Sequence, residues 1–153
     1  MQVWYWGAEM NDTSGTIAES AADPFLDASR EGRLLAAECR ACLHLFLPFG
    51  PVCPRCWSIN IGQRELSGAG EVATFTVYRQ SYHPDFSVPY VLALIALVEG
   101  PRMISNVIDC APELVRIGMP VTVRFVPRGD LVLPLFAPDS SPTRNPEPQG
   151  ENP

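Results

Sequence analysis

Four of the five cysteines in this chain form two Cys-x-x-Cys pairs with ten residues between them. The pairs are Cys39 with Cys42 and Cys53 with Cys56. A two-residue spacer lets both sulfurs of a pair point at one metal ion, and four thiolates can surround zinc as a tetrahedron with Zn–S distances of about 2.3 Å. Because all four positions are thiolates, no coordination position stays open for water or substrate. The sequence therefore predicts one structural zinc ion per chain.

The same cysteines have other interpretations, namely two disulfides, an iron site, or small buried residues in a ribbon without metal. The first twenty residues contain neither a basic segment nor a long apolar run, so we expect no secretory signal and a cytoplasmic location. In a reducing compartment this spacing favours a metal over disulfides. His44 lies between the pairs and is interpreted as a surface residue, because four thiolates complete the site. Cys110, in an apolar stretch, is predicted to be a core or half-buried thiol.

Composition limits the classes of function. The 153 residues suffice for one domain of ordinary size or two very small ones. No segment approaches the ~18 uninterrupted apolar residues of a membrane span, so we expect no membrane partner. Lysine is absent, and residues 24–137 contain ten acidic residues and ten arginines, so this part is neutral. Nucleic-acid binders gain most of their affinity from phosphate contacts, and the lack of a basic face makes nucleic acid an unlikely partner.

The chain divides into four predicted segments. The first and last are rich in polar or small residues and are expected to be flexible or disordered. The cysteine-containing segment has almost no core of its own, so metal ligation must supply much of its folding free energy. The segments are a leader (1–22), a helix plus zinc ribbon (23–66), a barrel (67–137) and a tail (138–153).

A short helix is predicted in front of the cysteines. Asp23 is a good N-cap, Pro24 suits the first helical position, and the helical spacing of apolar residues continues to Leu34. Gly32 weakens the end of this helix. Trp57, directly after the last cysteine, is expected to pack over the metal site or at its boundary.

From Ser67 onward the pattern changes to alternating and β-branched residues, which predicts strands. A single helical turn over 111–115, capped by Asp109, separates the third strand from the fourth. This order is typical of the oligonucleotide/oligosaccharide-binding barrel, or OB fold, with another small Greek-key barrel as the alternative. The fold class is therefore mainly β. The predicted strands are 68–78, 90–98, 102–108, 120–126 and 131–136.

Helix, four-cysteine ribbon and five-stranded barrel, in this order, resemble the family known as domain of unknown function 35 (DUF35). These are proteins with a rubredoxin-like zinc ribbon and an OB fold that are associated with acyl-CoA metabolism. The resemblance covers residues 24–137. It rests on the order and spacing of several pieces, which are REGRLLAAECRAC, CPRCWS, SGAGEVATFTV, HPDFSVPYVLALIALVEGPRMISNV and IGMPVTVRF followed by LPLF.

The resemblance implies an accessory role. Members of the family are similar to subunits found with thiolases, 3-hydroxy-3-methylglutaryl-CoA synthases and thiolase-like aldolases of steroid side-chain degradation. The thiolase-like partner is then expected to hold the catalytic cysteine. The small subunit is expected to shape the acyl-CoA channel and to stabilise the assembly, in lipid, steroid or aromatic-compound breakdown. A CoA thioester would be a ligand shared with that partner.

One turn departs from the family pattern. Relatives commonly carry Pro-Pro-Arg before the second cysteine pair, whereas Phe49, Gly50 and Pro51 occupy this turn here. If that arginine contacts a CoA phosphate in relatives, another residue must do so in this chain. Arg55 is a candidate substitute, and Arg79 and Arg102 are further candidates.

The long loop over 79–89 is a candidate partner contact, because a surface loop with several rings suggests an interface anchor. Its candidate contact residues are Tyr82, His83 and Phe86. The equally weighted alternative is a loop that folds back over the mouth of the barrel.

Independent catalysis and nucleic-acid binding are the competing functions. Nucleophilic catalysis needs a nucleophile beside a base, and the two histidines and Cys110 do not suggest such a pair. Single-stranded nucleic-acid binding is the stronger alternative, because OB folds often use aromatic rings for stacking. It also needs a positive groove, which the neutral charge of residues 24–137 does not provide.

Overall fold

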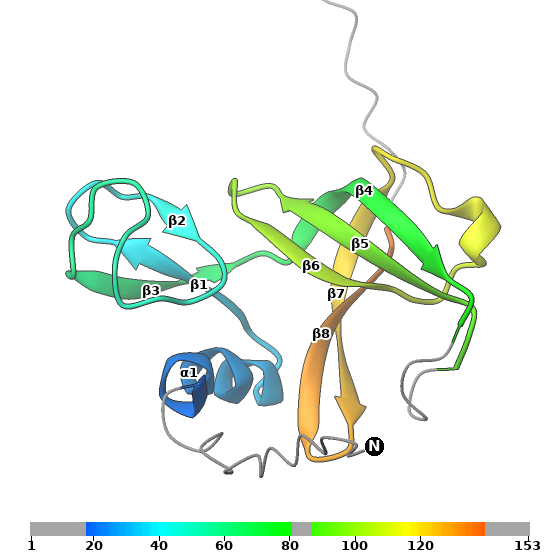
Figure 1. Cartoon of the computed structure of the whole chain (residues 1–153), viewed down its shortest axis with the longest axis horizontal. Helices are drawn as coiled ribbons and strands as arrows, with labels where there is room; N and C mark the ends of the chain where they lie inside the picture. The colour runs from blue at the N-terminus through cyan, green and yellow to red at the C-terminus, as the bar shows by residue number, and fades with distance from the viewer. Residues whose placement is uncertain (1–17, 81–86, 140–153) are drawn as a thin grey trace, which may run out of the picture.

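The structure, a computed structural model, describes residues 18–80 and 87–139 (Figure 1). One helix is followed by a three-stranded sheet with strand order β2-β1-β3 and then by a closed five-stranded barrel with order β4-β5-β6-β8-β7. The first part consists of α1 (Ala18–Arg30), β1 (Leu34–Cys39), β2 (Leu45–Phe46) and β3 (Ile61–Leu66). The barrel consists of β4 (Ala69–Tyr78), β5 (Tyr90–Leu97), β6 (Arg102–Val107), β7 (Pro120–Arg128) and β8 (Leu131–Pro138).

The barrel confirms the predicted OB fold, a short helix between its third and fourth strands included. That helix is a single 3₁₀ turn, η1 (Pro112–Leu114), preceded by Ala111 at the N-cap position. The prediction that Asp109 caps it is wrong. Asp109 takes a left-handed φ of 56°, and no side chain caps the turn. Because Pro112 already occupies the first helical position, one orphan N–H is missing and a cap has less to satisfy.

The helix begins six residues earlier than predicted. It starts at Ala18, so Pro24 lies inside it rather than at its first position. The residues before Pro24 include the good helix formers Ala18, Glu19 and Ala21, and the helix extends through them in front of the proline. The helix ends in a Schellman motif, in which Gly32 donates to the carbonyl of Ser29 (3.1 Å) and Arg33 to that of Ala28 (2.8 Å). Leu34, expected in the helix, begins β1 instead.

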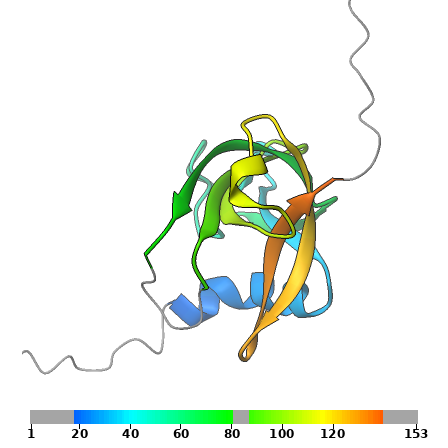
Figure 2. The ribbon, with the colours of Figure 1, turned by 90° about the vertical axis from the view of Figure 1, so that its right-hand side faces the viewer.

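One hydrophobic core joins the small sheet to the barrel. Leu34 and Leu66, from β1 and β3, belong to the same buried cluster as Val72, Ile95 and Phe136 of the barrel. Helix α1 lies against β1 and β8, below the small sheet in Figure 1 and below the barrel in Figure 2. Its Phe25 packs against this cluster. The small sheet is therefore held to the barrel by shared packing as well as by the chain itself.

The linker between β3 and β4 is fixed by hydrogen bonds and by a glycine. The Ser67 N–H donates to Oε1 of Glu99 (2.7 Å), in the β5–β6 turn, and the Val123 N–H donates to the Gly68 carbonyl (2.8 Å). Gly68 has a φ of +76°, and a Cβ there would lie 2.2 Å from Cγ1 of Val123. Only glycine fits this position, so the linker is a tight joint.

Among the described residues, none of the helices has the length and apolar character of a membrane span.

The carboxylate of Glu99 gives this joint a pH dependence. Burial raises the pKa of Glu99, but hydrogen bonds from the Ser67 backbone and side chain outweigh it, so the pKa lies below the ordinary value of 4.5. A lowered folded-state pKa stabilises the fold above the ordinary glutamate range, and this stabilisation is lost as the pH falls through the folded-state pKa.

We therefore expect Glu99→Gln to lower the free energy of unfolding at pH 7 by about 1 kcal/mol, the usual contribution of a hydrogen bond to a charged acceptor less solvent screening. The deficit should shrink as the pH is lowered below about 4.5. Denaturant titrations of both proteins over a pH series measure it. Glu71→Gln, at an exposed glutamate of β4, is the control and should change nothing. A Glu99→Gln deficit of equal size at all pH values would contradict this role.

Candidate metal centre

The sulfurs of Cys39, Cys42, Cys53 and Cys56 converge at one end of the molecule. All four lie within 4.8 Å of one another, with 3.5 Å between Cys39 and Cys56 and 3.7 Å between Cys42 and Cys53. Around a tetrahedral zinc ion, with Zn–S distances of about 2.3 Å, sulfurs lie about 3.8 Å apart. The cluster thus fits zinc, and it offers four thiol ligands in a closed set.

The two cysteine pairs have the same local structure. In the first, Leu43 donates its N–H to the Cys39 carbonyl (2.7 Å), and Cys39 donates to the His44 carbonyl (2.9 Å). In the second, Trp57 donates to the Cys53 carbonyl (3.0 Å), and Cys53 donates to the Ser58 carbonyl (2.9 Å). The Arg55 N–H also lies 3.4 Å from the Cys53 sulfur. These bonds define the two turns that carry the sulfurs.

Each pair is followed by a residue with left-handed backbone. Leu43 has a φ of 59° and Trp57 a φ of 61°, a region that costs a non-glycine residue about 1 kcal/mol or more. This conformation reverses the chain after the second cysteine, so that the carbonyls of His44 and Ser58 accept from the N–H groups of Cys39 and Cys53. The sequence supplied no glycine at either position, so the strain was not foreseen.

The metal end has little core besides its cysteines. Its separate buried cluster consists of Ala37, Cys39, Phe46 and Cys53, so two of four members are metal ligands. Such a cluster buries too little apolar surface to stabilise the loops around it. Metal ligation is therefore expected to supply much of the stability here.

The thiol pKa values show why a cation is needed. Burial raises the pKa of Cys39, but backbone N–H groups of Cys42 and Ala41 donate to its sulfur and lower the pKa to about 6. The Ser58 N–H lowers the pKa of Cys56, yet the sulfurs of Cys42 and Cys39 together raise it to about 12. Several thiolates cannot share so small a volume without a cation, and a divalent metal would remove this repulsion.

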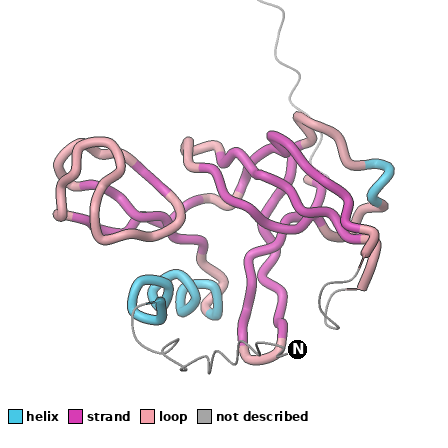
Figure 3. The backbone as a smooth tube through the Cα atoms, in the orientation of Figure 1, coloured by secondary structure: helices cyan, strands magenta, loops and turns pink. Residues whose placement is uncertain are grey.

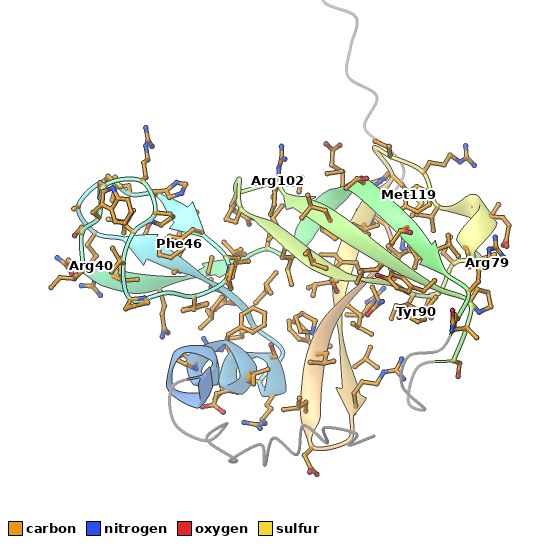
Figure 4. The ribbon with its side chains drawn as sticks, in the orientation of Figure 1. Arg40, Phe46, Arg79, Tyr90, Arg102 and Met119 are labelled. Atoms are coloured by element: carbon orange, nitrogen blue, oxygen red, sulfur yellow. The ribbon has the colours of Figure 1, made fainter. Side chains whose placement is uncertain are left out.

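Of the other sequence-predicted site residues, the three described arginines are not brought together. Arg55 lies in the second cysteine pair, while Arg79 and Arg102 lie at opposite ends of the β4–β5–β6 sheet, as Figure 4 shows for the latter two. Tyr82, His83 and Phe86 lie outside the described residues. The three arginines thus do not form one phosphate site within the isolated chain.

The remaining side chains near the metal behave differently. His44 is half-buried and stacks on Phe46, with ring centroids 6.0 Å apart, and it is not a member of the ligand cluster. Trp57 is 79% exposed and directly follows Cys56, so of the two predicted placements it lies at the boundary of the metal site rather than over it. Cys110 is half-buried against the barrel core, as predicted.

Sequence reasoning also missed a small cavity where β6 diverges from the β7–β8 hairpin. Its volume is about 100 Å³, below the range of about 300–1,000 Å³ for sites that enclose drug-sized ligands. This cavity alone cannot enclose a CoA thioester. Its lining includes Tyr90, Asn106, Ile108, Arg128 and Leu133.

Fold and site together define a zinc ribbon joined to an OB-fold barrel, and comparison with known proteins agrees. Residues 26–60 match the family model described as "ChsH2, rubredoxin-like zinc ribbon domain". Residues 63–126 match the model described as "ChsH2, C-terminal OB-fold domain". The chain belongs to the DUF35 family.

Relatives with assigned names include a "DUF35 domain-containing scaffold protein" of Methanocaldococcus jannaschii, 37% identical over 95 residues, which are 60% of this chain and 67% of that protein. A "Probable enoyl-CoA hydratase alpha subunit" of Thermomonospora curvata is 38% identical over 115 residues, which are 74% of this chain but 36% of that protein. The chain thus spans about a third of the hydratase subunit. A solved structure titled "Ltp2-ChsH2(DUF35) aldolase" superposes with a TM-score of 0.72 and 37% identity, over 77% of this chain and 94% of the compared chain.

Replacing one ligand tests the metal centre. Cys53→Ser should abolish stoichiometric zinc, measured by elemental analysis, and should lower the melting temperature by several degrees or more, because the metal end loses its main stabilising interaction. Cys110→Ser is the matched control and should retain one zinc ion per chain. Equal zinc content in the two variants would contradict the assignment of Cys53 as a ligand.

Proposed function

We propose that this chain is a non-catalytic accessory subunit of an acyl-CoA enzyme complex whose catalytic partner has a thiolase fold. The accessory subunit shapes the acyl-CoA channel and stabilises the assembly, and the partner carries the catalytic cysteine. The complex acts in lipid, steroid or aromatic-compound degradation in the cytoplasm. In this proposal, residues 23–66 and 67–137 form the ribbon and barrel units, and the four cysteines hold one structural zinc ion.

The observation that carries this proposal is that the outer face of strand β5 is apolar. Along β5, the buried core residues alternate with Tyr90, Leu92, Leu94 and Ala96 on the outer face, so the strand is apolar on both faces. Across the ladder, Leu94 pairs with Ile104 of β6, which is 69% exposed. An antiparallel sheet with one solvated face normally places polar residues there. An apolar outer face supports the inference that a partner protein covers this strand in the assembled complex.

The nucleophilic and basic side chains among the described residues support the proposal that catalysis takes place on the partner. Cys110, the described thiol outside the metal cluster, packs against the core and donates to the Ala111 carbonyl (3.5 Å). His44, the histidine that the structure describes, stacks on Phe46 in the ribbon. Neither group forms the nucleophile–base pair that covalent catalysis requires. The relatives named as a scaffold protein, a hydratase subunit and an aldolase complex support a hetero-oligomer.

The competing function, single-stranded nucleic-acid binding, is less well supported by the barrel surface. Tyr78 and Tyr90 stack on each other, with centroids 5.1 Å apart and planes 1° from parallel, so one face of each ring is already covered. Arg79 and Arg102 lie at opposite ends of the sheet, with the apolar residues of β5 between them. A stacking platform needs exposed rings along a continuous positive groove.

In this proposal the acyl-CoA lies between the two subunits. The cavity at the β6–β8 seam is too small to enclose it, so a channel needs walls from the partner as well. Arg55, Arg79 and Arg102 are candidates for phosphate contacts, and Tyr82, His83 and Phe86 are candidates for acyl-CoA or partner contacts. Each would act only in the assembled complex.

Co-expression with the thiolase-fold protein encoded nearest to this chain tests the proposal. We expect a stable complex on size exclusion, and no turnover of an acyl-CoA thioester by the isolated chain. Ile104→Glu should raise the Kd of the complex at least tenfold, because it places a charge in the apolar face. This corresponds to a loss of about 1.4 kcal/mol or more of binding free energy.

Ile117→Glu is the control for this experiment, since Ile117 is equally exposed but lies in the connection between η1 and β7 and not in β5 or β6. It should leave the complex intact. Separate elution of the two wild-type proteins, or thioester turnover by the isolated chain, would contradict the proposal. Nanomolar binding of a labelled oligonucleotide at physiological salt would favour the competing function.

A further inference from the structure

The three most exposed large hydrophobic side chains of the described residues all lie at the metal end. They are Leu43, Trp57 and Ile59, which are 72%, 79% and 81% exposed. Leu43 and Trp57 directly follow Cys42 and Cys56, whose sulfurs belong to one cluster, so both residues lie beside the metal site. Figures 1 and 3 show the two loops that carry them at the end of the molecule farthest from the barrel. We call this surface, together with Arg40 and Arg55, the ribbon tip.

Backbone conformation shows that folding alone does not explain these residues. Leu43 and Trp57 both have left-handed backbone, where glycine is the least strained residue. Neither side chain is compensated by burial against the described residues. Large apolar groups kept at strained and exposed positions point to a role outside the fold.

Two arginines give the ribbon tip a positive rim. Arg40 and Arg55 occupy the spacers of the two cysteine pairs and are exposed, and neither takes part in an ion pair with the described residues. The side chain of Arg40 packs across Gly62 of β3, which leaves room for it because glycine has no side chain. A Cβ there would come within 2.7 Å of the Arg40 Nε. Figure 4 places Arg40 at the far end of the ribbon.

We propose that the ribbon tip docks into an apolar recess of the partner subunit that is rimmed by carboxylates. This inference rests on the proposed function and assigns a second contact besides the β5 face. Tryptophan and arginine are the residue types that most often dominate binding at protein interfaces. Apolar side chains supply the buried centre, and Arg40 and Arg55 pair with acidic groups at the rim.

Other occupants match this surface less well. In a two-fold dimer of this chain the same patch would contact itself, which brings the arginines of both copies together. A nucleic acid could stack on Trp57 and pair with the arginines, but it gains little from the aliphatic side chains of Leu43 and Ile59. Residues 140–153 contain polar residues, proline and glycine, and no large apolar side chain that could cover the tip.

The double variant Leu43→Gly/Trp57→Gly separates docking from folding. It relieves two strained positions, so its melting temperature should equal or exceed that of the wild type, with one zinc ion retained. Its affinity for the co-expressed thiolase-fold protein should fall at least tenfold. Ile117→Ala, which removes an equally exposed aliphatic group elsewhere, is the control and should bind as the wild type does. Arg40→Glu should also weaken binding, and added salt should weaken the wild-type complex more than this variant.

The outcomes distinguish this inference from the proposed function. If the wild type binds the thiolase-fold protein and the double variant binds equally well, the ribbon-tip contact is wrong and the accessory role stands. If the wild type does not bind, the accessory role itself is wrong, and this contact falls with it. A dimer of the isolated chain that the double variant abolishes, or oligonucleotide binding that it abolishes, would assign the tip to another occupant and overturn the proposal.

Discussion

The convergence of four cysteine sulfurs is the constraint on which this structure depends. The metal end buries four residues of its own, and two of them are ligands. Without a cation, one thiolate in this cluster disfavours a second, since the pKa of Cys39 is lowered to about 6 and that of Cys56 is raised to about 12. A divalent metal reverses the sign of this interaction and turns a repulsive cluster into a crosslink between two loops. The loops then hold strained residues such as Trp57 in fixed, exposed positions.

The joint between ribbon and barrel extends this constraint through the molecule. Leu34 and Leu66 share a core with the barrel, and Gly68 leaves no room for a side chain against Val123. The Glu99 carboxylate ties the same linker to the β5–β6 turn. The ribbon is therefore held against the barrel, so the ribbon tip and the apolar face of β5 can act as parts of one surface arrangement. A partner that contacts both surfaces would have to match the distance between them as well as their chemistry.

Much of this arrangement could be predicted from local sequence, because the signals were local. The Cys-x-x-Cys spacing predicted the cluster, and alternation predicted the barrel strands to within two residues, since both depend on neighbours in the chain. The helix start was wrong because Asp23 and Pro24 form a good N-terminal signal, while the helix formers before them extend the helix. The exposure of Trp57 was missed because it depends on a left-handed backbone at a residue that is not glycine. The separation of Arg79 and Arg102 depends on strand register, which no single segment encodes.

Hydrogen–deuterium exchange on the chain, alone and mixed with the proposed thiolase-fold partner, tests most directly the claim that this protein acts by being held in an assembly. The account predicts slower exchange on binding in two places, namely the loops of residues 40–60 and strands β5 and β6. Unchanged exchange in both regions, in a sample in which the two proteins are mixed at high concentration, would contradict it.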